Sequence, residues 1–130
     1  MAIEEAIHTT LIGDATLAAL VGTRVYNLRL PQKPTYPGVT LARVSTDEDL
    51  AHDGPTGYET ARFQIDSYAA TSAAVRAVAN AVRDALNGLS GTAGGVVIHV
   101  ISFENQVDEW GDLLDVWRIT QDYMVQWRRP

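Results

Sequence analysis

The first apolar side chains of the sequence recur at helical spacing. They share one helical face, and they are Ile3, Ile7 and Leu11. Gly13 interrupts this face, and Asp14 after it is a good N-cap for a second short turn that Gly22 can end. Residues 2–21 are therefore predicted to form one broken helix or two short helices.

The middle of the chain predicts a longer amphipathic helix over residues 72–87. Thr71 or Ser72 would cap its start, and Asn87-Gly88 would end it. One stripe would be buried, consisting of Val75, Val78, Ala79, Val82 and Leu86.

Other segments favour strands. They are predicted over residues 25–28, 38–45, 58–69, 96–103 and about 113–128. Apolar and polar side chains alternate over 58–69 and in the last strand, which indicates one wet face for each. Residues 96–103 are apolar on both faces, as in a central strand or one covered by a neighbouring subunit. Pro31, Pro34 and Pro37 predict an extended loop.

The polar stretches 45–57 and 104–112 are predicted as loops between these strands. Consecutive strands joined by loops imply antiparallel pairs. The predicted fold class is therefore α+β, a two-layer domain with a mainly antiparallel sheet of about four strands and two helices packed on one face. With 130 residues and 14.2 kDa, the chain is expected to form one domain over residues 1–130.

Charge excludes some functions. Ten basic and 16 acidic residues give a net charge of −6, which argues against a duplex-DNA binder that needs a basic face. The sequence contains no cysteine, which excludes disulfides, thiolate metal sites and cysteine nucleophiles. No apolar run approaches the ~20 residues of a membrane span, and the acidic N-terminus predicts no signal peptide.

Candidate chemistry is weak along the whole sequence. His8, His52 and His99 lack ligand-like spacing, so no metal site is predicted. The segment starting at Asp47 fails the EF-hand pattern, since Ala51 and Tyr58 stand at ligand positions. No nucleophile–base pair is evident, and we expect neither an enzyme nor a cofactor.

Ten of the 16 acids lie in the two predicted polar loops or at their edges. Plain solvation of two loops is the simpler interpretation. The functional alternative is a negative surface that faces a basic partner or a lumen through which DNA slides. Trp110 lies within the second acidic loop, where it either anchors an interface or folds back onto its own core.

Several segments in this order resemble one phage family. They are LAALVGTRVYNLRLPQKPTYPGVTLARVS, the loop ending LAHDGPTG, ARFQIDSYAAT, AAVRAVANAVRDALNG and the closing long strand. The chain resembles the tail-completion or tail-to-head joining family of long-tailed phages and phage-like particles, also called tail terminators, over about residues 3–127.

The resemblance implies a structural virion protein that caps the head-proximal end of the tail tube as a ring, which is expected to be a hexamer. Its implied partners are further copies of itself, the major tail tube protein and the head–tail connector or stopper protein. DNA would pass through the lumen without specific binding, and no membrane is involved. The protein would be made in the host cytoplasm and end at the head–tail junction of the virion.

The family has no catalytic motif to transfer, so the expected contact residues are guesses. A neighbouring copy or the tube is expected to contact Arg24, Tyr26, Arg29, Pro31, Gln32 and Trp110. The lumen or the head is expected to face Asp47, Glu48, Asp49 and Asp53. Two alternatives stay open: a head-completion or adaptor protein of the connector, and a small dimeric ligand-binding regulatory module.

Overall fold

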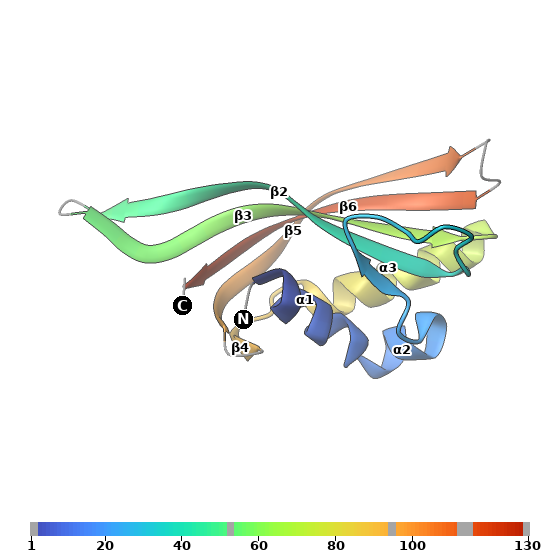
Figure 1. Ribbon diagram of the computed structural model, residues 1–130, viewed down its shortest axis with the longest axis horizontal. Coiled ribbons are helices and arrows are strands. Elements are labelled where there is room, and N and C mark those ends of the chain that lie inside the picture. The colour runs from blue at the N-terminus through green and yellow to red at the C-terminus, as the bar shows by residue number, and fades with distance from the viewer. Residues whose placement is uncertain (1–2, 52–53, 94–95, 112–115, 129–130) are drawn as a thin grey trace.

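The computed structural model describes residues 3–51, 54–93, 96–111 and 116–128. Along the chain, the elements are α1 (Ile3–Ile12), α2 (Ala15–Val21), β1 (Val25–Asn27), β2 (Gly38–Ala51), β3 (Gly54–Ala69), α3 (Ser72–Leu86), β4 (Gly91–Ala93), β5 (Val96–Gly111) and β6 (Val116–Arg128). The strands form a single sheet in the order β1-β2-β3-β6-β5-β4. The helices lie along one side of this sheet (Figure 1).

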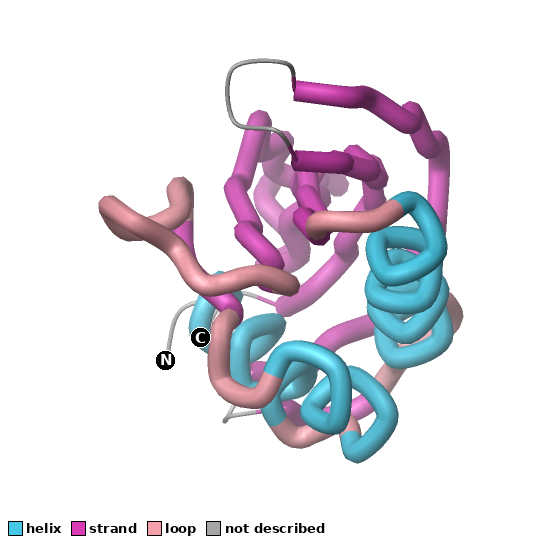
Figure 2. Tube along the Cα trace, turned by 90° about the vertical axis from the view of Figure 1, so that its right-hand side faces the viewer, coloured by secondary structure: helices cyan, strands magenta, loops and turns pink. Residues whose placement is uncertain are grey.

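The sheet is mixed and strongly curved. β1 runs parallel to β2, whereas the pairs β2–β3, β3–β6, β6–β5 and β5–β4 are antiparallel. Viewed from its end, the sheet curls into a half-barrel with the helices packed along it (Figure 2). β6, which follows all the other elements in the sequence, joins the β2–β3 and β4–β5 hairpins into one sheet, because it pairs with β3 on one side and β5 on the other.

The helices begin where the capping residues predict. The side chain of Asp14 accepts a hydrogen bond from the backbone N–H of Leu17 and starts α2, which ends at Gly22 with a φ of 60°. Thr71 caps α3 in the same way through the N–H of Ala74. The prediction of two short helices and a longer amphipathic helix is confirmed, and the whole predicted stripe of α3 is buried.

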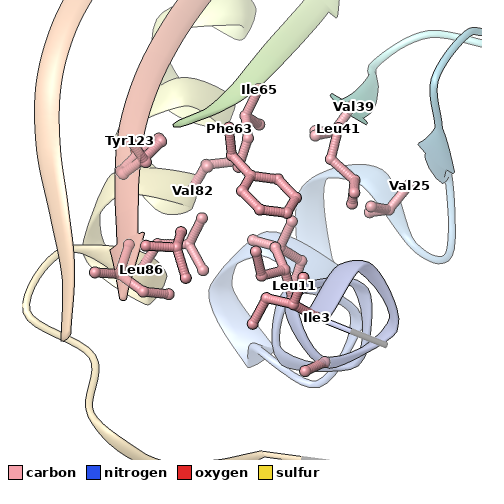
Figure 3. Close-up of a cluster of buried hydrophobic side chains, with 14 of the residues drawn as sticks. Ile3, Leu11, Val25, Val39, Leu41, Phe63, Ile65, Val82, Leu86 and Tyr123 are labelled. Atoms are coloured by element: carbon pink, nitrogen blue, oxygen red, sulfur yellow. The ribbon is translucent and has the colours of Figure 1, made fainter. Parts of the chain in front are cut away.

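The core fills the space between the helices and the sheet. Phe63 on β3 lies at its centre, facing Leu11 of α1 and Val82 of α3 (Figure 3). The period-two pattern of β3 is confirmed, because Ala61, Phe63, Ile65 and Ser67 are all buried. Apolar side chains on one face of a strand and one stripe of each helix thus account for the layering.

One polar side chain links three elements inside the core. Gln121 of β6 is fully buried, and its Nε2 donates to the carbonyl oxygen of Ala79 on α3 at 3.1 Å and to Oε1 of Gln106 on β5 at 3.0 Å. Its Oε1 accepts a hydrogen bond from the Tyr123 hydroxyl at 3.1 Å. Burying an amide costs little when its groups are paired in this way.

The prediction of polar loops over residues 45–57 and 104–112 is wrong. β2 continues to Ala51 and β3 begins at Gly54, while β5 continues to Gly111. Both stretches therefore belong to β-hairpin arms: the β2–β3 arm extends past the helices, and the β5–β6 arm runs to the opposite end of the sheet, on the side where α3 lies (Figure 1). The ladder satisfies the backbone of each arm, so the strands persist where neither face needs apolar side chains.

The predicted fold class is also wrong in its counts and proportions. The described part of the chain holds six strands and three helices, and most of it is strand, where about four strands and two helices were expected. The glycine-rich stretch after α3, for which no strand was predicted, contributes β4. The parallel β1 was not anticipated, because strands joined by loops were expected to pair antiparallel.

Candidate functional site

A basic surface occupies the β1 edge of the sheet and the connection that follows it. We call residues 24–33 the basic edge; they include Arg24, Arg29 and Lys33 and no acid. Arg29 and Lys33 are exposed, whereas Arg24 is half-buried and its Nε donates to the carbonyl oxygen of Pro37 at 2.8 Å. This bond ties the start of β1 to the end of the proline-rich connection.

Leu28 stands at the point where the chain leaves β1. Its N–H donates to the carbonyl oxygen of Leu41 on β2 at 2.8 Å, and its backbone has a φ of 76°. A branched residue rarely adopts this left-handed conformation. Its side chain is nevertheless 70% exposed, so the molecule presents an apolar group in a strained turn, within the segment that also contains the exposed cations Arg29 and Lys33.

An acidic surface lies on the outer part of β5. We call residues 104–110 the acidic arm; they include Glu104, Asp108 and Glu109 and no base. The arm begins at a register shift between Phe103 and Asn105, which marks an irregularity in the pairing of β5 with β6.

Two of the acids in the arm have partners in the chain. Glu109 pairs with Arg118 of β6, and this hydrogen bond raises the pKa of the Arg118 guanidinium. Asp108 lies 3.8 Å from Arg76 of α3. All four side chains are well exposed, so each pair is worth less than about 1 kcal/mol and is easily exchanged for another partner.

The acidic arm also exposes apolar side chains. Trp110 is 43% exposed and lies against Trp117 of β6, with ring centroids 4.9 Å apart. Val107 is 45% exposed. Trp110 therefore packs against Trp117 of its own chain with part of its ring and leaves the rest exposed, and its role as an interface anchor stays a prediction.

The basic edge and the acidic arm lie at the same level on opposite edges of the sheet. The paired residues trace straight rows across five strands. One row contains Val25, Val39, Ser67, Ile119 and Asp108, and the next contains Tyr26, Thr40, Asp66, Thr120 and Val107. Measured along the curved sheet, such a row is about 19 Å long, from four strand spacings of about 4.8 Å.

The structure does not bring the six guessed contact residues together. The basic edge contains Arg24, Tyr26, Arg29, Pro31 and Gln32, whereas Trp110 lies on the acidic arm. Tyr26 is half-buried, while Pro31 and Gln32 are exposed. One guessed surface is thus two surfaces, separated by the whole width of the sheet.

The four guessed acids fall on the β2–β3 hairpin. Asp47 is exposed near the outer part of β2, and Glu48 pairs in register with Glu59 of β3. Asp49 is part of β2, and Asp53 lies outside the described residues. They were predicted to occupy a loop, but at least three of them belong to a strand.

Sequence reasoning missed a polar ladder on the sheet face that lies away from the helices. Arg62 of β3 faces Asp122 of β6 at 3.7 Å. Asp66 lies within 3.5 Å of the Tyr68 hydroxyl, and burial raises the pKa of Tyr68 above its ordinary value, with Asp66 adding to the effect. The alternating polar positions of β3 and β6 were the available signal for this ladder.

One concave feature lies beside α1. A groove of about 310 Å³ between α1 and β1 is lined by Glu4, Glu5, His8, Thr9 and Asn27. The Nε2 atom of His8 lies 2.9 Å from the carbonyl oxygen of Val25, which engages the ring in a structural contact. Within the described ranges, no three His, Cys, Asp or Glu side chains converge as metal ligands.

The geometry is thus that of a protein with charged edges and arms. Comparison with known families gives a match to the tail completion protein gp17 family over residues 5–126. The chain belongs to this family. The match includes both the basic edge and the acidic arm, so these surfaces are parts of the family domain.

A solved structure supports the assignment. The chain is similar to a protein in the virion of a native gene transfer agent particle, with 26% sequence identity and a TM-score of 0.78. The similarity covers 98% of this chain and 95% of that one. Comparison with curated protein sequences gives no match.

Family membership makes the chain a tail completion protein of a phage-like virion, with a structural role in tail assembly. Among the described helices, none combines the length and apolar character that crossing a bilayer requires.

Proposed function

We propose that the chain is a tail terminator that closes the head-proximal end of the tail tube as a hexameric ring. The ring joins the tube to the head–tail connector and lets DNA pass through its lumen. The chain acts as one domain, without catalysis and without a cofactor. Its partners are further copies of itself, the major tail tube protein and the connector or stopper protein.

The observation that carries this proposal is the family match, which spans almost the whole chain. The likeness to a virion protein supports it, because it covers nearly all of both chains. The elongated shape with two opposed arms suits a subunit that bridges two different structures (Figure 1). Arms on one end of a ring can contact the tube while arms on the other end contact the connector.

The β2–β3 hairpin is the surface that we assign to the lumen or the head. It extends away from the helices, and Asp47 near its outer part is exposed. Acidic side chains repel the phosphates of DNA and keep a passing duplex mobile. The same charge would attract a basic rim on a connector protein.

The deciding experiment mixes the protein with purified tail tubes of the same particle and images them by negative stain. Ring-shaped caps at one end of each tube are the expected result. Uncapped tubes, together with a stable dimer in light scattering, would overturn the proposal in favour of a regulatory module. Binding to purified heads in the absence of tubes would instead indicate a head-completion protein.

Charge reversal tests the role of the β2–β3 hairpin. We expect Asp47→Lys/Glu48→Lys to cap tubes normally but to reduce DNA delivery by assembled particles, because lysines would bind the passing phosphates. The matched control Glu5→Lys/Asp84→Lys reverses two exposed acids on α1 and α3 and should leave delivery unchanged. Equal delivery by both variants would contradict the assignment to lumen or head.

A further inference from the structure

The basic edge and the acidic arm contain equal numbers of opposite charges, although Asp108 and Glu109 of the arm also face Arg76 and Arg118 in exposed pairs. The basic edge has three cations and no anion, and the acidic arm has three anions and no cation. Each surface also exposes apolar side chains, Leu28 on the first and Val107 with Trp110 on the second. Matched charge around exposed apolar groups is typical of two surfaces that bind each other.

These surfaces cannot meet within one chain, because they lie at opposite ends of the same sheet rows. They can meet between two copies. If a second copy stands beside the first in the same orientation, the acidic arm of one lies level with the basic edge of the next. A contact between two different surfaces repeats from copy to copy and closes into a ring when the rotation allows it.

We infer that the acidic arm of each copy docks on the basic edge of the next copy, and that this contact joins the subunits of the ring. The inference rests on the proposed function, since it identifies the surfaces through which identical subunits associate. Asp108 lies in the same row of the sheet as Val25, and Val107 lies in the same row as Tyr26. When two copies stand side by side, the acids of one arm therefore lie next to the cations that flank β1 of the neighbouring copy.

The contact is made by side chains and does not extend the sheet. The outward carbonyl oxygens of β1 already have partners, because Val25 is engaged by His8 and Asn27 accepts from the N–H of Arg29. Strand addition needs free backbone groups on the receiving edge. The cations of the basic edge are better placed, since Arg29 and Lys33 form no ion pair with any residue of the described ranges.

Charge reversal gives the first test. Arg29→Glu/Lys33→Glu makes both surfaces of the subunit acidic, and Glu104→Lys/Asp108→Lys makes both basic. Each variant alone should cap fewer tube ends than the wild type by more than about tenfold, because like charges would face each other at every contact. An equimolar mixture should recover capping, because alternating copies restore opposite charges at every contact of an even-numbered ring.

The absence of cysteine in the chain allows a second test. Leu28→Cys/Val107→Cys places one thiol on each surface, and the intervening strands β2, β3 and β6 keep the two thiols too far apart for an internal disulfide. Mild oxidation of the capped tubes should give a ladder of covalent oligomers. The control Leu28→Cys/Val97→Cys uses a valine of β5 with 46% exposure that lies in register with Arg128, far from the level of Leu28, and it should give no ladder.

The outcomes separate the inference from the proposed function. If the wild type caps tubes while both reversal variants cap equally well and no ladder forms, the inference is wrong and the terminator function stands. If oxidation gives the ladder for free protein that caps no tube, the inference stands and the terminator function is wrong. A wild type that neither caps tubes nor forms oligomers overturns both.

Discussion

Replacing Gln121 by leucine should destabilise the protein through the groups that it leaves behind. In the native core, this amide accepts from the Tyr123 hydroxyl and donates to Gln106 and to the backbone of α3. In Gln121→Leu, the Tyr123 hydroxyl is fully buried without an acceptor, which costs roughly 1–3 kcal/mol. With the other lost bonds partly offset by apolar burial, we expect a total loss of about 2–3 kcal/mol in unfolding free energy.

Tyr123→Phe provides the matched partner for a double-mutant cycle. It removes the hydroxyl and orphans only Oε1 of Gln121, so it should cost about 1–2 kcal/mol. In Gln121→Leu/Tyr123→Phe no orphan remains at this pair, so the double variant should be no less stable than Gln121→Leu alone. The expected coupling energy is therefore about 1–2 kcal/mol.

Urea denaturation followed by tryptophan fluorescence measures these differences, and Trp127, which is buried, reports on the core. The comparison requires that all four proteins unfold in one transition with the same m-value. If the two single effects add to within about 0.5 kcal/mol in the double variant, the hydrogen bond between Tyr123 and Gln121 does not stabilise the core, and the reasoning is refuted.

Further predictions concern pH, a cap and an orphan hydroxyl. Burial raises the pKa of Tyr123 and Tyr68, so these tyrosines ionise at lower pH in the unfolded chain, and the free energy of unfolding should fall as the pH rises above about 10. Tyr123→Phe should make this fall with pH less steep, and an equally steep fall would contradict the prediction. Asp14→Ala should lower the unfolding free energy by about 1 kcal/mol in thermal or urea melts, whereas Asp14→Ser should lose much less. Ser67 Oγ has no partner among the described groups, so Ser67→Ala should leave stability unchanged or raise it by up to about 1 kcal/mol, and a loss above that would reveal a bond to this hydroxyl.

The sequence was most informative where side chains are buried on one face. The stripe of α3, the alternation of β3 and the caps at Asp14 and Thr71 each predicted an observed element. These signals are local, because a helix face or a strand face repeats within a few residues. They can therefore be recognised without knowledge of the tertiary structure.

The arms could not be predicted in this way. Residues 45–51 and 104–111 are mostly polar and lack a regular apolar face, and their strand conformation depends on a partner strand rather than on burial. The parallel pairing of β1 likewise depends on where the proline-rich connection returns the chain. Polarity predicted exposure correctly but gave the wrong backbone conformation.

The candidate surfaces show the same division. Charge clusters in the sequence identified Trp110 and its neighbouring acids as a possible contact region. Only the strand register shows that this region and the one around Arg24 lie at opposite edges on the same rows. The spatial relation between two surfaces is a property of long-range pairing, which a single sequence does not display.

The central position of β6 affects how the protein is made. β3 acquires its first neighbour from the adjacent hairpin, but its second neighbour, β6, is synthesised only after α3, β4 and β5. β3 therefore has one unpaired edge until β6 has been synthesised, and the pairing of segments so distant in the sequence is intrinsically slow. An unpaired strand edge can pair with another chain, so we expect a chain truncated before β6 to aggregate more readily than one that contains it.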